Sequence, residues 1–242
     1  MKNYEPGMSF GEDVAEIYDD EPRGDEAEAV AFLEQLAGGR PALELAIGTG
    51  RIALPLAARD IRVDGIDISP AMVAKLRAKP GGDQLSVTMG DFAEVPLSGT
   101  YRLIYVVYNT FHNLLTQDDQ VRCFQNVAAH LTDDGSFLIE AGVPNFLHRV
   151  FEHQYVHAES IGVGEVWLDV GRHDPLTQRH EETHVRMTTD GVRLYPTVQR
   201  YTWPSELDLM ARIAGLRLQE RWDGWNREPF TSTGNVVSVF GR

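Results

Sequence analysis

A glycine-rich turn is the feature of the sequence with the clearest chemical meaning. Gly48-Thr49-Gly50 follows a short apolar run at 42–47 and precedes a helical pattern at 51–59. Glycine lets the backbone approach a ligand closely, and the start of a helix offers free N–H groups to an anionic or polar moiety. We therefore predict a site for a small nucleotide-like ligand. The turn also fits the dinucleotide pattern Gly48-x-Gly50-x-x-Ala53, so by itself it leaves NAD open.

Two carboxylates near the ends of later strands narrow the choice of ligand. Asp67 ends the second apolar run, and Asp91 follows the third in Gly90-Asp91-Phe92. A carboxylate after the second strand can accept hydrogen bonds from both hydroxyls of a ribose, which also suits NAD. A carboxylate beside an aromatic ring can bind the amino group of adenine while the ring flanks the base. With Asp91 and Phe92, the interpretations as a NAD site and as another nucleotide site begin to differ.

The elements that must position these residues alternate between strands and helices. Short runs rich in Val, Ile and Leu alternate with longer helical patterns through the first 140 residues, which predicts βαβ units and a parallel sheet. Ser69 and Pro70 suit the start of one helix, and Thr116 suits the start of another. The predicted strands are 42–47, 61–66, 85–89, 103–107 and 136–141.

The pattern changes after residue 150. Apolar and polar residues alternate at 165–170 and 183–187, and turn signals at Asp174-Pro175 and Asp190-Gly191 separate these segments. This arrangement predicts antiparallel hairpins. A helix at 204–214 and two strands, 216–222 and 235–240, complete the predicted order of elements.

In order and spacing, these motifs resemble those of the class I S-adenosylmethionine (SAM)-dependent methyltransferases, in the group of small-molecule N- and O-methyltransferases that includes the glycine and aminosugar enzymes. The resemblance is close over about residues 12–141 and looser over the last two strands. The first motif of the family, acidic-x-Gly-x-Gly-x-Gly, falls on Glu44, Ala46, Gly48 and Gly50, with alanine in place of the first glycine. The resemblance implies one α/β domain, 1–242, with a Rossmann-like seven-stranded mixed sheet. The last strand would be antiparallel, and an antiparallel β insertion would follow strand 5.

The resemblance also implies which residues hold SAM. The backbone around Ala46 and Gly48 would hold the methionine part, Asp67 the ribose, and Asp91 the adenine edge. The full implied set is Tyr18, Glu44, Ala46, Ile47, Gly48, Gly50, Arg51, Asp67, Ile68, Met72, Gly90, Asp91, Phe92 and Tyr108. Residues 14–19 resemble an element that folds over the cofactor, which implies a lid at 1–24. The insertion at 150–203 would cover the acceptor pocket or form a dimer surface.

The residues that would contact a methyl acceptor are less sharply defined. Methyl transfer is an in-line displacement at an activated carbon, so proximity and orientation matter most, and a general base helps when the acceptor is a hydroxyl. His112, on the loop after the fourth strand, is the predicted base, with packing in that loop as an equal alternative. Asn113, Glu140, Asn145 and Tyr195 are predicted to bind the acceptor, although a structural hydrogen bond accounts for Glu140 equally well.

The composition of the chain limits the classes of molecule that it is expected to bind. The formal net charge of -14 disfavours nucleic acid, because phosphate binding needs clustered Lys and Arg. The single cysteine, Cys123, excludes an intrachain disulfide and suits a reducing compartment. His180 and His184 would share one face of a strand but lie too far apart for one ion, so no metal is expected. With no signal peptide and no apolar run of about 20 residues, we expect a cytoplasmic protein that does not bind membranes.

These observations predict a SAM-dependent methyltransferase that acts on an amine or hydroxyl of a small metabolite, as a monomer or a homodimer. An RNA or protein methyltransferase is one alternative. A SAM-binding regulator without catalysis is another, and a dinucleotide-binding, dehydrogenase-like domain is a third.

Overall fold

Five apolar runs form the parallel part of a large sheet. The computed structural model describes residues 1–242 apart from 2–3, 5, 21 and 232–234. The parallel strands are β1 (Ala42–Leu45), β2 (Val63–Asp67), β3 (Ser86–Met89), β4 (Tyr101–Val106) and β5 (Leu131–Gly142). Strand β1 pairs with β2 and β4, β2 with β3, and β4 with β5. The predicted parallel sheet is therefore confirmed.

The carboxyl-terminal end of the chain completes this sheet with antiparallel strands. Strand β12 (Asn235–Gly241) pairs antiparallel with β5 and with β10 (Arg217–Asp223). A two-residue strand, β11 (Glu228–Pro229), pairs with the end of β10. The sheet therefore has eight strands in the order β11-β10-β12-β5-β4-β1-β2-β3, and the predicted count of seven is wrong. The extra strand escapes prediction because two residues with an edge proline carry no alternating pattern.

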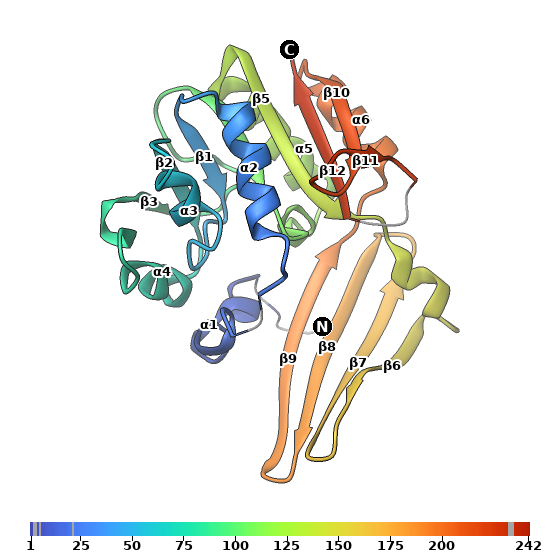
Figure 1. The fold of residues 1–242 in the computed structure, drawn as a ribbon. Helices are drawn as coiled ribbons and strands as arrows, with labels where there is room; N and C mark the ends of the chain where they lie inside the picture. Colours follow the sequence, from blue (N-terminus) through green and yellow to red (C-terminus); the bar gives the residue numbers. More distant parts are fainter. Residues whose placement is uncertain (2–3, 5, 21, 232–234) are drawn as a thin grey trace.

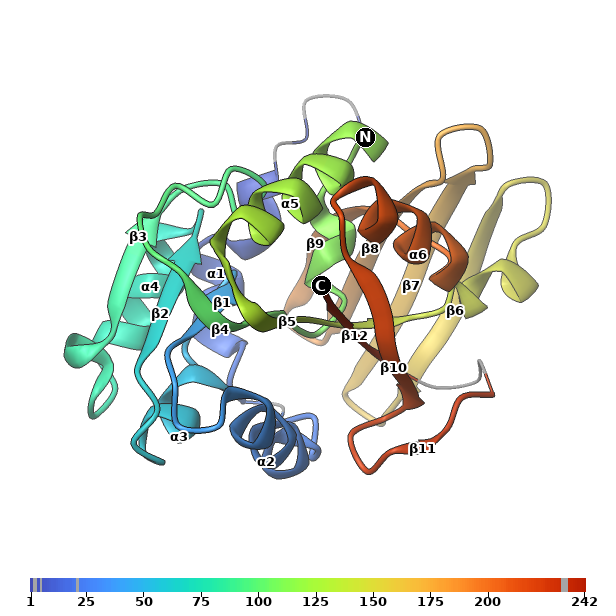
Figure 2. The ribbon, with the colours of Figure 1, turned by 90° about the horizontal axis from the view of Figure 1, so that it is seen from above.

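Helices cover both faces of the large sheet (Figure 2). On one face, α2 (Glu26–Ala37) and α3 (Ala53–Ala57) pack against the side chains of Leu103 and Tyr105. On the other, α5 (Gln117–His130) and α6 (Pro204–Ile213) pack against Ile104 and Val106. Because successive side chains of a strand point to opposite faces, each strand contributes to both cores.

Two helix starts follow the predicted capping. The Ser69 side chain accepts a hydrogen bond from Met72 N at 3.1 Å at the start of α4 (Pro70–Arg77). The Thr116 side chain accepts one from Asp119 N at 3.1 Å at the start of α5. Four short 3₁₀ helices complete the helical elements of the described chain: η1 (Pro6–Phe10), η2 (Gly82–Gln84), η3 (Thr110–Asn113) and η4 (Asn145–Arg149). Among the described residues, no helix has both the length and the apolarity needed to cross a membrane.

A separate antiparallel sheet, here called sheet B, follows β5. Its order is β6 (Gln154–Ile161), β7 (Glu165–Asp174), β8 (Arg179–Thr188) and β9 (Gly191–Arg200), as the predicted hairpins require. Figure 1 shows these strands extending away from the large sheet. The strand register places Trp167, Asp169, His184, Arg186 and Tyr195 on one face, which we call the inner face. The outer face carries mainly aliphatic side chains.

The N-terminal segment, η1 with α1 (Glu12–Ile17), lies between sheet B and the large sheet (Figure 1). Ser9 Oγ donates a hydrogen bond to the carbonyl of Pro196 on β9 at 2.8 Å. Ser69 Oγ donates to the carbonyl of Phe10 at 2.6 Å. Just beyond α1, Asp19 accepts from Thr49 Oγ1 at 2.8 Å. The segment is therefore attached to both sheets.

Candidate functional site

The turn after β1 is built from left-handed backbone. Ala46, Gly48 and Gly50 have φ values of 61°, 56° and 76°. Glycine adopts this region without a steric cost, whereas in other residues the Cβ atom makes the region unfavourable. A side chain at Gly50 would also collide with the buried Leu76. The spacing of small residues predicted from the sequence thus reflects alternating left-handed positions, and Ala46 occupies one of them with a Cβ.

Asp67 fixes this turn to the neighbouring strand. Its Oδ2 accepts a hydrogen bond from Gly48 N at 2.7 Å, and its Oδ1 accepts one from Ser69 N at 2.8 Å. Burial raises the pKa of the Asp67 carboxyl. The carboxylate is therefore held at the carboxyl end of the sheet, where open α/β sheets place their ligands.

A small cavity of about 90 Å³ lies beside this carboxylate. Nine predicted site residues line it: Tyr18, Ala46, Gly48, Asp67, Ile68, Met72, Asp91, Phe92 and Asn113. They come from the N-terminal segment and from the ends of several strands, so the structure brings together side chains far apart in the sequence. Phe10, Thr110 and Leu114 also line the cavity and escaped prediction. Thr110 lies in the loop after β4, which contains the predicted residues Tyr108 and Asn113, so its position in that loop could have identified it. No feature of the sequence distinguished Phe10.

Four of the residues assigned to SAM lie behind this cavity instead of lining it. Glu44 is buried and accepts a hydrogen bond from Tyr105 Oη at 3.0 Å, and burial raises its pKa well above the usual range. The Ile47 side chain packs against Gly65. Gly50 packs against Leu54 and Leu76, and Gly90 N donates to the Asp67 carbonyl at 2.8 Å. These residues shape and hold the cavity wall.

A second cavity, of about 640 Å³, adjoins the first and shares Phe10 and Tyr18 with it. Its walls are the N-terminal segment, the end of β4 at Tyr108, and the inner face of sheet B. On that face the Trp167 and Tyr195 rings stack with centroids 5.7 Å apart. Tyr195 was predicted to bind an acceptor and lies here. Trp167 was not among the predicted site residues, because the alternation of a strand does not show which of its faces borders a cavity.

Three charged side chains surround Tyr108, which lines the second cavity. The Tyr108 N–H donates to the Glu140 carboxylate. The Arg23 guanidinium lies 4.2 Å from the Tyr108 ring centroid and donates to Glu140 at 3.3 Å. Arg51 lies 4.8 Å from the Tyr18 ring and 5.8 Å from the Tyr108 ring, and it lines the second cavity. Glu140 is fully buried, so its position supports the structural alternative considered for it.

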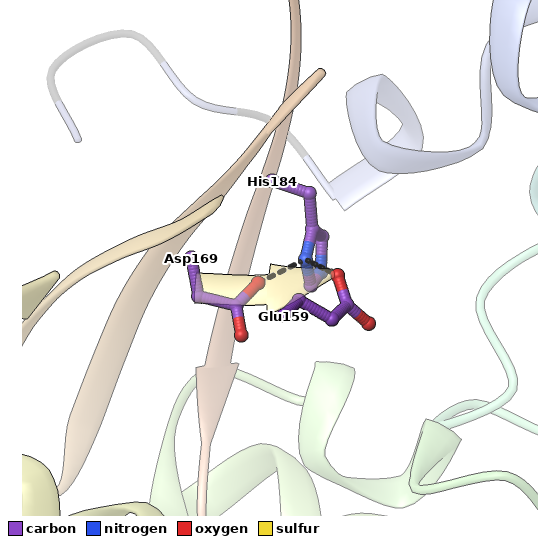
Figure 3. A group of neighbouring side chains, drawn as sticks. All are labelled: Glu159, Asp169 and His184. Atoms are coloured by element: carbon purple, nitrogen blue, oxygen red, sulfur yellow. Dashed lines mark hydrogen bonds and ion pairs between the residues drawn. The ribbon is translucent and has the colours of Figure 1, made fainter. Parts of the chain in front are cut away.

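Glu159, Asp169 and His184 form a cluster on the inner face of sheet B (Figure 3). His184 Nδ1 lies 2.7 Å from Asp169 Oδ1 and 3.9 Å from Glu159 Oε2. The ligand atoms of these three side chains all lie within 4.8 Å of one another, a spacing that could hold a metal ion. Glu159 reaches the group at a register shift in β6, which the sequence did not reveal. The absence of a metal stays a prediction.

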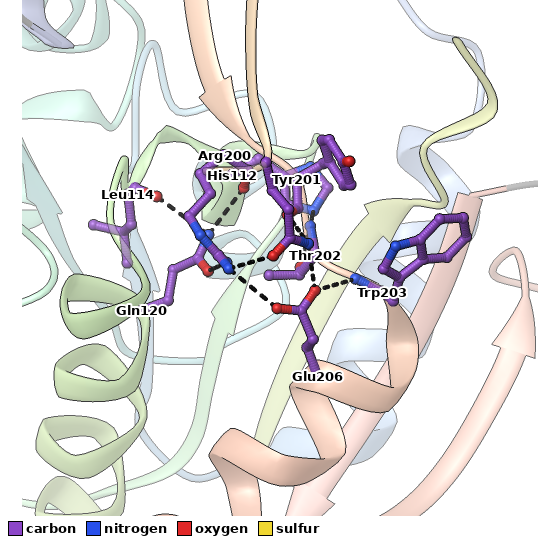
Figure 4. A network of polar contacts seen from close by, with 9 residues as sticks. His112, Leu114, Gln120, Arg200, Tyr201, Thr202, Trp203 and Glu206 are labelled. Atoms are coloured by element: carbon purple, nitrogen blue, oxygen red, sulfur yellow. Dashed lines mark hydrogen bonds and ion pairs between the residues drawn. The ribbon is translucent and has the colours of Figure 1, made fainter. Parts of the chain in front are cut away.

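His112, the predicted general base, lies in a buried polar network (Figure 4). Its Nε2 lies 3.2 Å from Thr202 Oγ1 and accepts from Thr202 N at 3.4 Å. Burial and the nearby Arg200 lower its pKa to about 4. His112 lines a third cavity of about 550 Å³, together with Asn145, instead of the cavity beside Asp67. The base role stays a prediction, and these surroundings favour the packing alternative.

Comparisons with known proteins agree with this geometry. Residues 42–135 match the family model described as a methyltransferase domain. The solved structure of the CcbJ methyltransferase from Streptomyces caelestis is 33% identical, covers 98% of this chain and 99% of its own, and superposes with a TM-score of 0.91. The chain is a class I SAM-dependent methyltransferase. Its cofactor is therefore SAM, and the dehydrogenase alternative is excluded.

More distant similarities also extend over most of the chain. The curated cypemycin N-terminal methyltransferase of a Streptomyces species is 24% identical over 203 residues, which are 83% of this chain and 82% of that protein. The sugar N-methyltransferase KedS8 from a Streptoalloteichus species is 20% identical, with coverage of 95% and 92% and a TM-score of 0.66.

Replacing Ala46 with glycine tests the strain in the turn. The left-handed backbone costs an alanine about 1–2 kcal/mol, while the added freedom of glycine in the unfolded chain costs about 0.5–1 kcal/mol. We expect Ala46→Gly to raise the free energy of unfolding by roughly 0.5–1 kcal/mol, measured by urea denaturation. Ala74→Gly, on the exposed side of α4, is the control and should lower it by about 1 kcal/mol. A fall in both variants would contradict strain at Ala46.

The low pKa of His112 predicts a loss of stability in acid. Because its folded pKa of about 4 lies below the usual 6.5, the unfolded chain takes up the proton first as the pH falls. This contribution is complete above pH 6.5 and is lost between pH 6.5 and 4, up to about 3 kcal/mol. The pH dependence of urea unfolding in that range should be shallower in His112→Gln. An unchanged slope would show that His112 is not held in its neutral form.

Proposed function

We propose that this methyltransferase transfers a methyl group from SAM to the nitrogen of a small-molecule amine. The observation that carries the proposal is the second cavity, which adjoins the cavity beside Asp67 and is walled by aromatic side chains of sheet B. Its volume of about 640 Å³ lies within the range of small-ligand sites. The N-terminal segment would act as the lid, and residues 150–203 as the cover of the acceptor.

The residues that line the first cavity suit the adenosine part of SAM. Asp67 offers a carboxylate whose orientation is fixed by two backbone N–H groups, so it can accept from ribose hydroxyls without rearrangement. Ile68 and Met72 offer apolar surface for the adenine, and Asp91 with Phe92 lies at the same cavity. Arg51, with Tyr18, would face the methionine end, where an anionic carboxylate needs a cation.

When bound, SAM supplies a methyl carbon activated by its sulfonium. The chain has to hold the acceptor in line with that carbon and to take up the amine in its neutral form. Tyr108 is fixed by Glu140 and Arg23 and borders the second cavity, so it would position the reacting nitrogen. The aromatic pair Trp167 and Tyr195 would pack against the body of the acceptor.

Two observations favour an amine over a hydroxyl. The predicted base His112 has its Nε2 engaged by Thr202 and a pKa of about 4, so it is poorly suited to deprotonate a hydroxyl. Several similar proteins are named N-methyltransferases, including the sugar enzyme KedS8 and the glycopeptide enzyme MtfA. The charge of -14 continues to disfavour an RNA acceptor.

Replacing Asp67 with alanine should weaken SAM binding. The loss of the ribose hydrogen bonds and of the anchor for Gly48 should cost about 1–3 kcal/mol, which is roughly a 5- to 150-fold rise in Kd. Calorimetric titration with SAM measures this change, and Asp83→Ala on the exposed η2 is the matched control. An unchanged Kd in Asp67→Ala would place the ribose elsewhere.

Turnover with a panel of acceptors tests the reaction itself. We expect release of S-adenosylhomocysteine with amines, such as aminosugars and peptide N-termini, and little with phenols or alcohols. Trp167→Ala should raise KM for the best acceptor about 10- to 100-fold, because an aromatic wall is removed, and should leave the Kd of SAM unchanged. Trp203→Ala, at an exposed position, is the control. SAM binding without turnover on any acceptor would support the regulator alternative, and turnover on phenols alone would correct the acceptor atom.

A further inference from the structure

Three carboxylates surround His184 on the inner face of sheet B. They belong to Glu159, Asp169 and Glu182, and we call these three residues with His184 the inner-face cluster. Besides its contacts with Asp169 and Glu159, His184 has its Nε2 3.8 Å from Glu182 Oε2. His184 lines the second cavity, while Asp169 and Glu182 line the third. The cluster therefore borders the cavity that we assign to the acceptor.

The strand register brings the second and third cavities together at this cluster. His184 on β8 lies directly opposite Asp169 on β7. Glu182 lies directly opposite Thr197 on β9, and Thr197 lines the second cavity. Side chains that are directly opposite on antiparallel strands have Cβ atoms about 5 Å apart. A molecule in the second cavity can therefore contact the cluster without a change in sheet B.

The charge of these carboxylates is not balanced by a cation of the chain. Within the described residues, they form ion pairs with His180 and His184 and none with Lys or Arg. Burial lowers the pKa of His180 to about 4, so this imidazole is neutral at neutral pH. Even a protonated His184 would balance only one of the carboxylates. Because like charges close together disfavour each other, a bound cation would be stabilised here.

Asp169 offers an oxygen that no group of the described chain uses. The residue is 8% exposed, and its Oδ1 is engaged by His184 Nδ1 at 2.7 Å. Its Oδ2 accepts no hydrogen bond from a described residue, and Figure 3 shows this oxygen directed away from His184. Buried polar atoms normally have a hydrogen-bond partner. Since Asp169 lines the third cavity, its Oδ2 marks a position for a donor that comes from outside the chain.

An ammonium group suits this position better than a metal ion does. A metal ion needs a deprotonated nitrogen of His184, and the Nδ1 that faces Asp169 and Glu159 is engaged in a hydrogen bond. An ammonium group carries several N–H donors and needs only carboxylate oxygens, which the cluster supplies. Hydrogen bonds between an ammonium group and a carboxylate are also stronger than neutral ones.

The group at the cluster differs from the amine that is methylated. The reacting nitrogen must be neutral to attack the methyl carbon, whereas neighbouring carboxylates favour the protonated form of an amine. Beside Tyr108, in contrast, the guanidinium groups of Arg23 and Arg51 lie 4.2 and 5.8 Å from the ring centroid. Positive charges of this kind disfavour a protonated amine. The two positions therefore suit two different groups of one acceptor.

We propose that the acceptor carries, besides the amine that is methylated, a second amino group that stays protonated and binds at the inner-face cluster. This inference rests on the proposed function, because it takes the second cavity as the acceptor site. It narrows the acceptors to diamines and to other molecules in which a charged amino group lies at a distance from the reacting one.

Binding to the complex with S-adenosylhomocysteine tests the inference without turnover. The probes are α,ω-diaminoalkanes of increasing length, each matched with the amino alcohol of the same length, and calorimetric titration measures both. We expect the best diamine to bind at least about 10-fold more tightly than its amino alcohol, because only the diamine places a charged donor at the cluster. Glu159→Gln and Asp169→Asn should remove this difference and leave the Kd of SAM unchanged.

A matched control and a separate rate measurement distinguish the possible failures. Glu152→Gln makes the same change at an exposed position just before β6 and should keep the preference for the diamine. Equal binding of diamine and amino alcohol, or a preference that both cluster variants retain, would overturn the inference even if amines are methylated. Binding of Zn²⁺ in place of the diamine, abolished by Asp169→Asn, would also overturn it. A diamine preference that depends on the cluster, without methylation of any amine, would support the site and contradict the proposed function.

Discussion

The hydrogen bond from Gly48 N to the Asp67 carboxylate joins the two strands on which the site depends. It fixes the left-handed turn after β1 to the end of β2, and Asp67 also caps the next turn through Ser69 N. One buried carboxylate thereby sets the positions of the loop, the start of α4 and the wall of the first cavity. The same carboxylate lines that cavity, so one side chain both supports the turn and borders the space beside it.

A second left-handed turn, just after the end of β4, is held by side-chain hydrogen bonds in a similar way and supports the second cavity. Tyr108 and Asn109 both have left-handed backbone, which turns the chain sharply after the strand. Glu140 on β5 holds the Tyr108 N–H, while Asn109 Oδ1 accepts from Gly142 N at 2.6 Å. Consecutive residues therefore contribute to different cavities: Tyr108 to the second cavity, and Asn109 to the third.

The sequence predicted those parts of the molecule that depend on local pattern. The parallel strands and the hairpins of sheet B follow from periodicity, and the starts of α4 and α5 follow from the capping residues Ser69 and Thr116. The residues around Asp67 and Asp91 follow from motif order. The two-residue strand β11 was missed because it carries no alternating pattern. The positions of His112 and Phe10 depend instead on contacts between distant segments. His112 was placed on the correct loop, but the sharp turn at Asn109 and the packing of Thr202, 90 residues later, decide where its ring lies. Phe10 lines both cavities only because Ser9 and Ser69 fix the N-terminal segment between two sheets.

That attachment has a consequence for how molecules enter and leave. Phe10 and Tyr18 separate the two cavities, and the segment that carries them is bonded to β9 at one end and to the turn after β1 at the other. A displacement of this segment that opens the cavity beside Asp67 would also remove part of the wall of the second cavity. Opening of one cavity is therefore coupled to a change in the shape of the other.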